Sequence, residues 1–280
     1  AIPLIKGPLV SRPSEAVIRD ALSLQDAGVK ELNLIAQDVT AYGLDRGESD
    51  ALADLLSELL PKIPHIPWVR LLYTYPGMVT DKRIELMAAK NQLLPYLDMP
   101  LQHADPTVLR AMSRPSNVEW VTETITKMRR LIPNLVVRTT MIVGYPNESD
   151  KSFEILRDFI QDTEFDHLGV FTYSPEVDTS SYDLGDPIPM EVKEARKAEL
   201  MEIQAGISLS RLKKLRGKNF EMLVEGVNPD EHLLVGRTYR DAPEIDGLAI
   251  ASGIAEEGEL VSIRVTNTTE YDIIGEQLKK

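Results

Sequence analysis

The chain has 280 residues, of which 43% are hydrophobic and 27% charged, as in an ordinary folded protein. No apolar run reaches the roughly 18 residues of a membrane-spanning helix, so we expect no transmembrane segment. The 31 basic and 44 acidic side chains give a net charge of −13, which disfavours non-specific nucleic-acid binding, and the absence of cysteine excludes disulfides and thiolate metal sites within this chain.

The first three-quarters of the chain alternate between β-rich runs and helical patterns. Strands are predicted at residues 30–37, 68–76, 94–103, 135–146 and 167–173. Helices are predicted at residues 14–27, 49–60, 80–90, 106–112, 118–131, 149–162 and 190–215. This alternation is typical of a parallel sheet with crossover helices, either doubly wound or curved into a barrel. Polar residues at the C-terminal ends of many strands favour a partial (β/α) barrel, because the strands then share one rim.

The first predicted helix has no strand in front of it. The opening residues AIPLI are apolar, but they are too short for a signal peptide and carry no basic flank or initiator methionine. A parallel sheet that lacks the strand feeding its first helix would expose an edge. We therefore expect a barrel that is missing its first strand, in a sequence truncated at its N-terminus.

The pattern changes after about residue 215. Short alternating strands separated by Gly, Pro and Asn predict a small antiparallel β-barrel, so that residues 1–215 and 216–280 form two domains. Residues 217–280 hold 13 acidic and 6 basic side chains, a net charge of −7. This sign is wrong for a nucleic-acid partner and favours a basic one.

The clearest strand ends in TTMIVGYP, residues 139–146. Arg138, Thr140 and Ile142 are predicted to share one of its faces. An arginine in an apolar strand needs an acceptor, so it either holds an anionic ligand group or pairs with a structural acid such as Asp98. Gly144 would let the backbone approach such a ligand closely.

Other polar residues end the neighbouring strands. Gln37 and the following Asp38 contribute either ligand contacts or an ordinary cap. Gln102 precedes His103, which is a base, a ligand donor or a capped loop residue. Only four histidines occur, without an HxH or HExxH pattern, so we reject a histidine metal site. Tyrosines close two further strands, where they stack on a flat ligand or pack the rim: Tyr75 and Tyr173.

Taken together, these segments resemble the radical-SAM methylthiotransferases along essentially the whole chain. The opening IPLIKGPLVSR resembles the segment after that family's CxxxCxxC motif. The runs LIAQDVTAYGLD, LLYTYP, YLDMPLQHAD, TTMIVGYPNES and GVFTYSPEVDTSSYDL resemble its successive strand ends, and the C-terminal domain resembles its TRAM barrel. The acidic barrel and DAPEIDG, residues 241–247, resemble the RimO branch, which methylthiolates an aspartate of a small-subunit ribosomal protein.

The resemblance implies S-adenosylmethionine (SAM) and [4Fe–4S] clusters as cofactors. The cluster cysteines would precede Ala1, so this chain alone should be inactive and should contain no catalytic or metal-binding residue. Arg138 would meet the SAM carboxylate or ribose, and the implied cofactor-binding residues are Ile2, Gln37, Gln102, Arg138, Thr140, Gly144 and Tyr145. Acidic residues would read Lys or Arg beside the target aspartate: Asp241, Glu244 and Asp246.

We therefore predict a transferase that modifies a basic ribosomal protein and works as a cytoplasmic monomer without binding nucleic acid directly. One alternative is a tRNA-adenosine methylthiotransferase, which the acidic barrel disfavours. The other is a naturally cysteine-free, non-catalytic binding module, which a gene that begins near Ala1 would favour.

Overall fold

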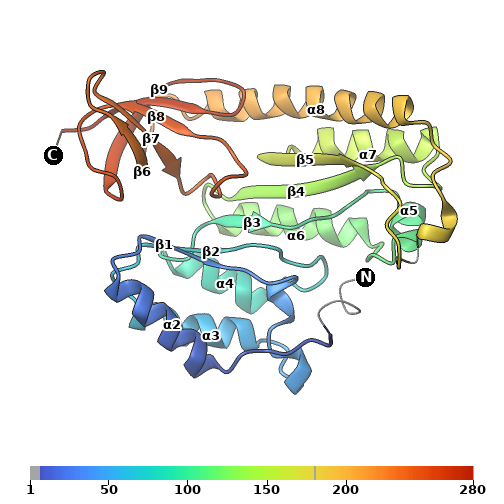
Figure 1. Cartoon of the computed structure of the whole chain (residues 1–280), viewed down its shortest axis with the longest axis horizontal. Coiled ribbons are helices and arrows are strands. Elements are labelled where there is room, and N and C mark those ends of the chain that lie inside the picture. The colour runs from blue at the N-terminus through green and yellow to red at the C-terminus, as the bar shows by residue number, and fades with distance from the viewer. Residues whose placement is uncertain (1–6, 180, 280) are drawn as a thin grey trace. The chain divides into compact units, whose positions relative to one another are not determined.

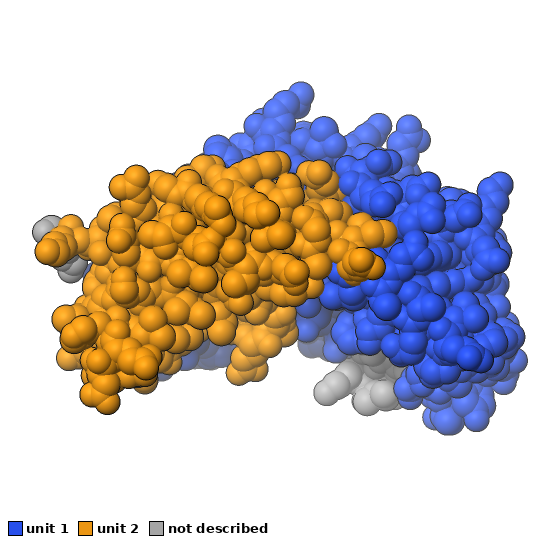
Figure 2. All heavy atoms as spheres, turned by 90° about the horizontal axis from the view of Figure 1, so that it is seen from above, with its two compact units in different colours: residues 1–163, 168–201 blue, residues 164–167, 202–280 orange. Residues whose placement is uncertain are grey.

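The computed structural model describes residues 7–179 and 181–279, which form two compact units (Figures 1 and 2). Unit 1 comprises the described residues up to Thr163 together with Leu168–Met201. Unit 2 comprises Glu164–His167 and the chain from Glu202 onward. The start of the chain, ahead of which a strand was expected to be missing, lies outside the described residues, as does the predicted cofactor residue Ile2.

In the part of unit 1 that the structure describes, five strands are joined by helices. The strands are β1 (Glu31–Leu34), β2 (Trp68–Leu71), β3 (Tyr96–Asp98), β4 (Val136–Val143) and β5 (His167–Thr172), the last of which begins with a residue of unit 2. The α-helices are α2 (Ser14–Asp26), α3 (Ala51–Leu59), α4 (Asp81–Ala89), α5 (Pro106–Ala111), α6 (Val118–Leu131) and α7 (Asp150–Thr163). Helix α8 (Met190–Lys213) contributes residues to both units.

The strands of unit 1 follow one another in chain order. β1 pairs in parallel with β2, and β3, β4 and β5 form a second sheet in which β3 is parallel to β4. A parallel bridge between Val69 and Leu93 links β2 to the segment ahead of β3. A doubly wound sheet would reverse its strand order at a switch point, whereas a barrel keeps the order of the chain. The order therefore confirms the barrel-type arrangement.

The residues of β4 alternate between buried and half-buried positions. Val137, Thr139 and Met141 are buried, whereas Arg138 and Thr140 are half-buried, as predicted from the two-residue repeat of a strand. The helices cover the side of the strands opposite Arg138 and Thr140. Figure 1 shows α2, α3 and α4 on one side of the β1–β2 sheet. β3 is shorter than the sequence predicts, since it ends at Asp98 and the chain after it meets β4 only in an isolated bridge between Gln102, whose φ is 74°, and Met141.

Unit 2 is built around a closed five-stranded barrel, β6 (Asn219–Asn228), β7 (Leu233–Thr238), β8 (Ala249–Ser252), β9 (Leu260–Thr268) and β10 (Ile273–Gln277). Its core includes Met222, Val224 and Ile263, with Leu212 of α8 beneath them. The barrel was predicted to be antiparallel, but β10 pairs in parallel with β8 while it closes the barrel against β9. Gly236 is required by close packing, since a Cβ there would lie 1.9 Å from the Leu223 carbonyl oxygen.

Candidate functional site

The open face of β4 and β5 forms the centre of the candidate site in unit 1. Thr140 lies beside Gly169 of β5, where a Cβ would be 3.9 Å from the Thr140 hydroxyl oxygen. Phe171, two residues further along β5, has 60% of its surface exposed. A hydroxyl, a bare backbone position and an exposed aromatic ring therefore lie next to one another, an arrangement that suits a flat ligand with polar edges.

Arg138 lies on the same open face and has an acidic partner. Its Nη1 donates to Asp98 Oδ1 at 2.9 Å, and the side chains of the two residues are 14% and 1% exposed. The other Asp98 oxygen accepts the Tyr73 N–H at 2.8 Å. The structural pairing considered from the sequence is thus present, and it fixes the guanidinium at the surface of the open face.

Two non-glycine residues adopt left-handed backbone conformations where the neighbouring strands β2 and β3 end. Tyr73 has φ 62° and Gln102 has φ 74°. Two backbone hydrogen bonds to β4 hold Gln102 there. Its backbone N–H donates to the Thr140 carbonyl oxygen, and its own carbonyl oxygen accepts the Ile142 N–H, both at 2.8 Å. Such conformations cost about 1–3 kcal/mol each and concentrate at functional sites.

Gly144 and Tyr145 form a buried turn at the end of β4. Gly144 has φ 77°, and a Cβ there would lie 2.3 Å from Cγ of Lys193. Tyr145 is 4% exposed, donates its hydroxyl to the Ala111 oxygen at 3.0 Å and contacts Tyr173 edge-on at 5.1 Å between ring centroids. Burial raises the pKa of Tyr145. The glycine is explained by the lysine stem that crosses it, and the two tyrosines pack the rim.

A network of buried charges supports this turn from α8. Glu148 accepts the Gly144 N–H at 2.9 Å and an Arg196 N–H at 2.6 Å. His103 Nε2 lies 3.3 Å from the same carboxylate, while its Nδ1 accepts the Asp105 N–H. His103 is therefore a buried loop residue. Arg196 could not be predicted from the sequence, because the helical pattern of α8 does not show which strand end the helix packs against.

The remaining predicted residues of unit 1 lie nearer the surface or outside the described part. Gln37 is exposed beyond the end of β1. Asp38, which follows it, caps the short 3₁₀ turn Val39–Ala41 by accepting the Thr40 N–H at 2.8 Å, so the ordinary capping role applies. The structure thus brings Gln102, Arg138 and Thr140 together at one rim.

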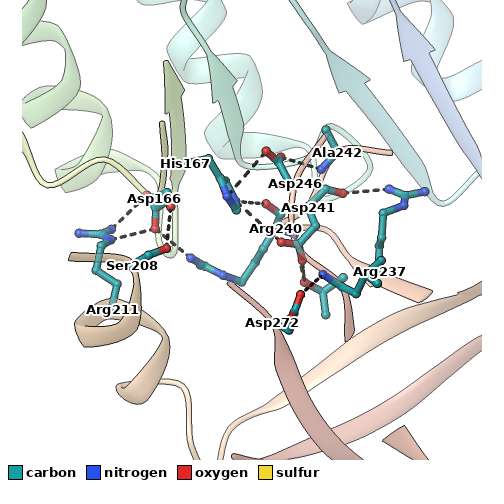
Figure 3. A network of polar contacts seen from close by, with 12 residues as sticks. Asp166, His167, Ser208, Arg211, Arg237, Arg240, Asp241, Ala242, Asp246 and Asp272 are labelled. Carbon is teal, nitrogen blue, oxygen red and sulfur yellow. Dashed lines mark hydrogen bonds and ion pairs between the residues drawn. The ribbon is translucent and has the colours of Figure 1, made fainter. Parts of the chain in front are cut away.

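Unit 2 holds a second cluster of buried charges (Figure 3). Asp166, 3% exposed, accepts two hydrogen bonds from Arg211, at 2.9 and 3.2 Å, and one from Arg240 at 2.8 Å. One carboxylate thus joins α8 to the loop after β7. A buried carboxylate with this many charged donors holds parts of a fold together.

His167 lies in the same cluster, between two of the predicted substrate-reading acids. Its Nε2 lies 3.8 Å from Asp241 and its Nδ1 lies 3.7 Å from Asp246. Asp241 also accepts the Thr238 hydroxyl at 3.1 Å, and Asp246 accepts the Ala242 N–H at 2.9 Å. Burial raises the pKa of Asp241 to about 6, although the neighbouring Arg240 acts in the opposite direction.

These contacts separate the three predicted acids. The side chains of Asp241 and Asp246 are 5% and 2% exposed and are occupied inside unit 2, which does not suit the expected contact with a partner. Glu244 is exposed at the tip of the loop, with φ 68°. A run of acidic residues in a loop predicts an exposed position. The burial of Asp241 and Asp246 could not be predicted from the sequence.

Neither a membrane span nor a metal cluster is found in the part of the chain that the structure describes. No helix there is long and apolar enough to cross a bilayer. No group of three or more His, Asp or Glu side chains within residues 7–179 and 181–279 is arranged to hold a metal ion.

Comparison with known proteins finds similarity in both units. The profile of the Radical SAM superfamily matches residues 4–160, and that of the TRAM domain matches residues 217–278. "Ribosomal protein uS12 methylthiotransferase RimO" of Myxococcus xanthus is 43% identical over 281 residues, with 100% of this chain and 59% of that protein covered. The protein of the same name from Pelobacter propionicus is also 43% identical, with 98% and 61% covered, and the chain thus spans about three-fifths of the length of the curated relatives it matches.

Proposed function

The chain belongs to the radical SAM superfamily, and on this premise we propose that the protein is a methylthiotransferase that modifies an aspartate of ribosomal protein uS12. The observation that carries this proposal is 43% identity along the whole chain to relatives named for that activity. The acidic barrel supports a basic protein substrate, because residues 217–280 carry a net charge of −7. A cytoplasmic monomer remains our expectation for its location and assembly.

The open face of β4 and β5 fits SAM. Arg138 offers a cation for a carboxylate, Thr140 offers a hydroxyl, and the exposed ring of Phe171 offers a stacking surface for a purine. Bound SAM supplies radical chemistry in combination with an iron–sulfur cluster. We propose that Gln102 adds a polar contact from the adjacent strand end, that Gln37 and Ile2 contribute from the N-terminal side, and that the turn of Gly144 and Tyr145 shapes the wall.

The iron–sulfur cluster does not fit the residues of this chain. A [4Fe–4S] cluster is held by cysteine thiolates, and the sequence contains no cysteine. The cluster ligands would have to come from outside these 280 residues, so we expect the chain by itself to be catalytically silent. Its own contribution is to bind and orient the cofactor and the substrate and to keep water away from them.

Substrate recognition is proposed for the loop between β7 and β8. Glu244 is exposed there and offers a carboxylate to a Lys or Arg beside the target aspartate. Asp241 and Asp246 would act indirectly, because their contacts with His167, Thr238 and Ala242 fix the shape of the loop. A surface carboxylate of this kind contributes mainly to specificity and to the rate of encounter.

The test uses the full-length gene product with reconstituted clusters. Incubation with SAM, a sulfur source, a one-electron reductant for the cluster and uS12 should add one methylthio group to an aspartate, as measured by mass spectrometry of the digested protein. The cysteine-free 280-residue chain, treated in the same way, is the matched control and should give no product. Modification of tRNA instead of uS12, with salt-sensitive tRNA binding, would contradict the proposal.

A further inference from the structure

The side chain of Arg114 lies on the ring of Tyr75, with 5.4 Å between the guanidinium carbon and the ring centroid. Both residues are half-buried. Within residues 7–179 and 181–279, the Arg114 side chain makes no hydrogen bond or ion pair. The Arg114 nitrogens still reach solvent, so their five N–H donors are open to an incoming ligand while the cation–π contact holds the group in place.

Arg114 belongs to the same rim as the open face. Tyr75 follows the end of β2, and its N–H donates to the Thr40 hydroxyl beyond the end of β1 at 3.2 Å. The preceding Thr74 N–H donates to the backbone carbonyl oxygen of Asp98 at the end of β3. The Asp98 carboxylate in turn binds Arg138. A continuous series of contacts thus connects Arg114 to the strand-end rim of the barrel.

Other cations close to these strand ends have acceptors of their own. Arg138 is paired with Asp98, and Lys193 is paired with Asp186 and donates to the Tyr173 oxygen. Arg83 donates to three backbone carbonyl oxygens. Arg114 differs from them because, among the residues that the structure describes, an aromatic ring alone supports its side chain. A planar guanidinium held in place without an acid partner is suited to bind an incoming carboxylate through two parallel hydrogen bonds.

We propose that Arg114 binds the carboxylate of the aspartate that is modified, with Tyr75 holding the guanidinium in position. This inference rests on the proposed function, which requires a side chain that recognises an aspartate at the rim. SAM also carries a carboxylate, for which Arg138 is the proposed partner. Separate binding measurements for SAM and for the substrate show which of the two carboxylates Arg114 binds.

The experiment compares Arg114→Gln with the wild-type full-length holoenzyme. Two uS12 peptides are used as probes, one with the target aspartate and one with asparagine at that position. The wild type should bind the aspartate peptide about tenfold or more tightly, and Arg114→Gln should lose that preference and lower kcat/KM for the aspartate peptide by a similar factor. Arg114→Lys should restore part of the preference, since it keeps the charge without the planar fork.

Arg110 provides the matched control. It lies on α5, is exposed and donates to the Thr107 hydroxyl at 3.3 Å, so Arg110→Gln removes a nearby positive charge without touching the ring contact. Its peptide preference should equal that of the wild type, and the Kd for SAM should be unchanged in all variants. If Arg114→Gln does not fold, Tyr75→Leu, which removes the supporting ring, should reduce the aspartate preference in the same direction.

Three results would overturn the inference. Equal aspartate preference in Arg114→Gln and the wild type would exclude a role in carboxylate recognition. Weaker SAM binding with unchanged peptide preference would assign Arg114 to the cofactor instead. An equal loss of preference in Arg110→Gln would show a general effect of charge. A wild-type holoenzyme that modifies no aspartate peptide at all would contradict the proposed function itself, which is a separate outcome.

Discussion

The side-chain stem of Lys193 occupies the space that any side chain at position 144 would need. A Cβ on Gly144 would lie 2.3 Å from Cγ and 2.7 Å from Cδ of the lysine. Lys193 is fully buried and cannot move aside easily, because its ammonium donates to the Tyr173 oxygen at 2.9 Å and is paired with Asp186. The end of β4 and the first turns of α8 therefore fit together only with glycine at this position.

Gly144→Ala should destabilise unit 1 by about 2–4 kcal/mol, because it adds a steric clash to the strain of a left-handed backbone. Gly28→Ala is the control for strain alone, since Gly28 has φ 83° and a Cβ there meets nothing within 4 Å. That variant should lose only about 1 kcal/mol. Urea denaturation of both variants measures the difference, and equal losses would show that Lys193 accommodates the methyl group.

Arg138→Ala in the full-length protein should weaken SAM binding by roughly 10- to 100-fold, the range for a lost charge-assisted hydrogen bond. Cluster content should stay intact, because Arg138 is no cluster ligand. Asp98, 1% exposed, loses its cation in this variant, so the free energy of unfolding should fall as well. Calorimetry gives the Kd for SAM and iron analysis gives the cluster content, and unchanged affinity would remove Arg138 from the cofactor site.

Asp166→Asn should destabilise unit 2 by about 3–5 kcal/mol, because it leaves the positive charges of Arg211 and Arg240 without their shared carboxylate. Glu164→Gln is the matched control, since the Glu164 side chain is 54% exposed and lies 3.7 Å from Arg211. Removing that surface charge should change the stability by less than about 1 kcal/mol. Chemical denaturation of the two variants would refute a structural role for Asp166 if their losses were equal.

Unit 2 should become less stable as the pH rises from about 4 to about 6. Burial raises the pKa of Asp241 from 3.8 to about 6, so in this range the folded protein holds a proton that the unfolded chain has released. The free energy of unfolding then falls with rising pH, and the ionised carboxyl costs about 3 kcal/mol at neutral pH.

Asp241→Asn tests this directly, because the amide keeps the shape of the acid and does not ionise. The stability of the variant relative to the wild type should rise between pH values of about 4.5 and 7.5, because only the wild type ionises the carboxyl at position 241. Urea denaturation at the two pH values provides the measurement. A stability difference that is the same at both would show that Asp241 ionises normally in the folded state.

The parts of the fold that follow local patterns could be predicted from the sequence. The two-residue repeat of β4 placed Arg138 and Thr140 on one face, and the helical pattern of residues 190–215 corresponds to Met190–Lys213. The parallel pairing of β10 with β8 could not be predicted, because strand patterns do not specify which strands become neighbours in a barrel.

Contacts between distant residues account for what the sequence did not reveal about the site. Gly144 was interpreted as a place where a ligand approaches the backbone, whereas the neighbour found there is Lys193, whose position in α8 no local pattern links to β4. Asp241 and Asp246 were interpreted as surface acids, because composition alone does not show that His167 lies between them. Arg138 and Asp98 were considered as a possible pair because an arginine in an apolar strand needs an acceptor, and the structure contains this pair.

Asp166 and His167 come well before the barrel in the chain, yet they belong to unit 2. A gene fragment that starts at Glu202 would encode every barrel strand but would omit the carboxylate that Arg211 and Arg240 share. The barrel therefore cannot be exchanged between relatives by joining two genes at a single position. A working chimera has to carry two separate stretches of sequence from the same parent, Glu164–His167 and the chain from Glu202 onward.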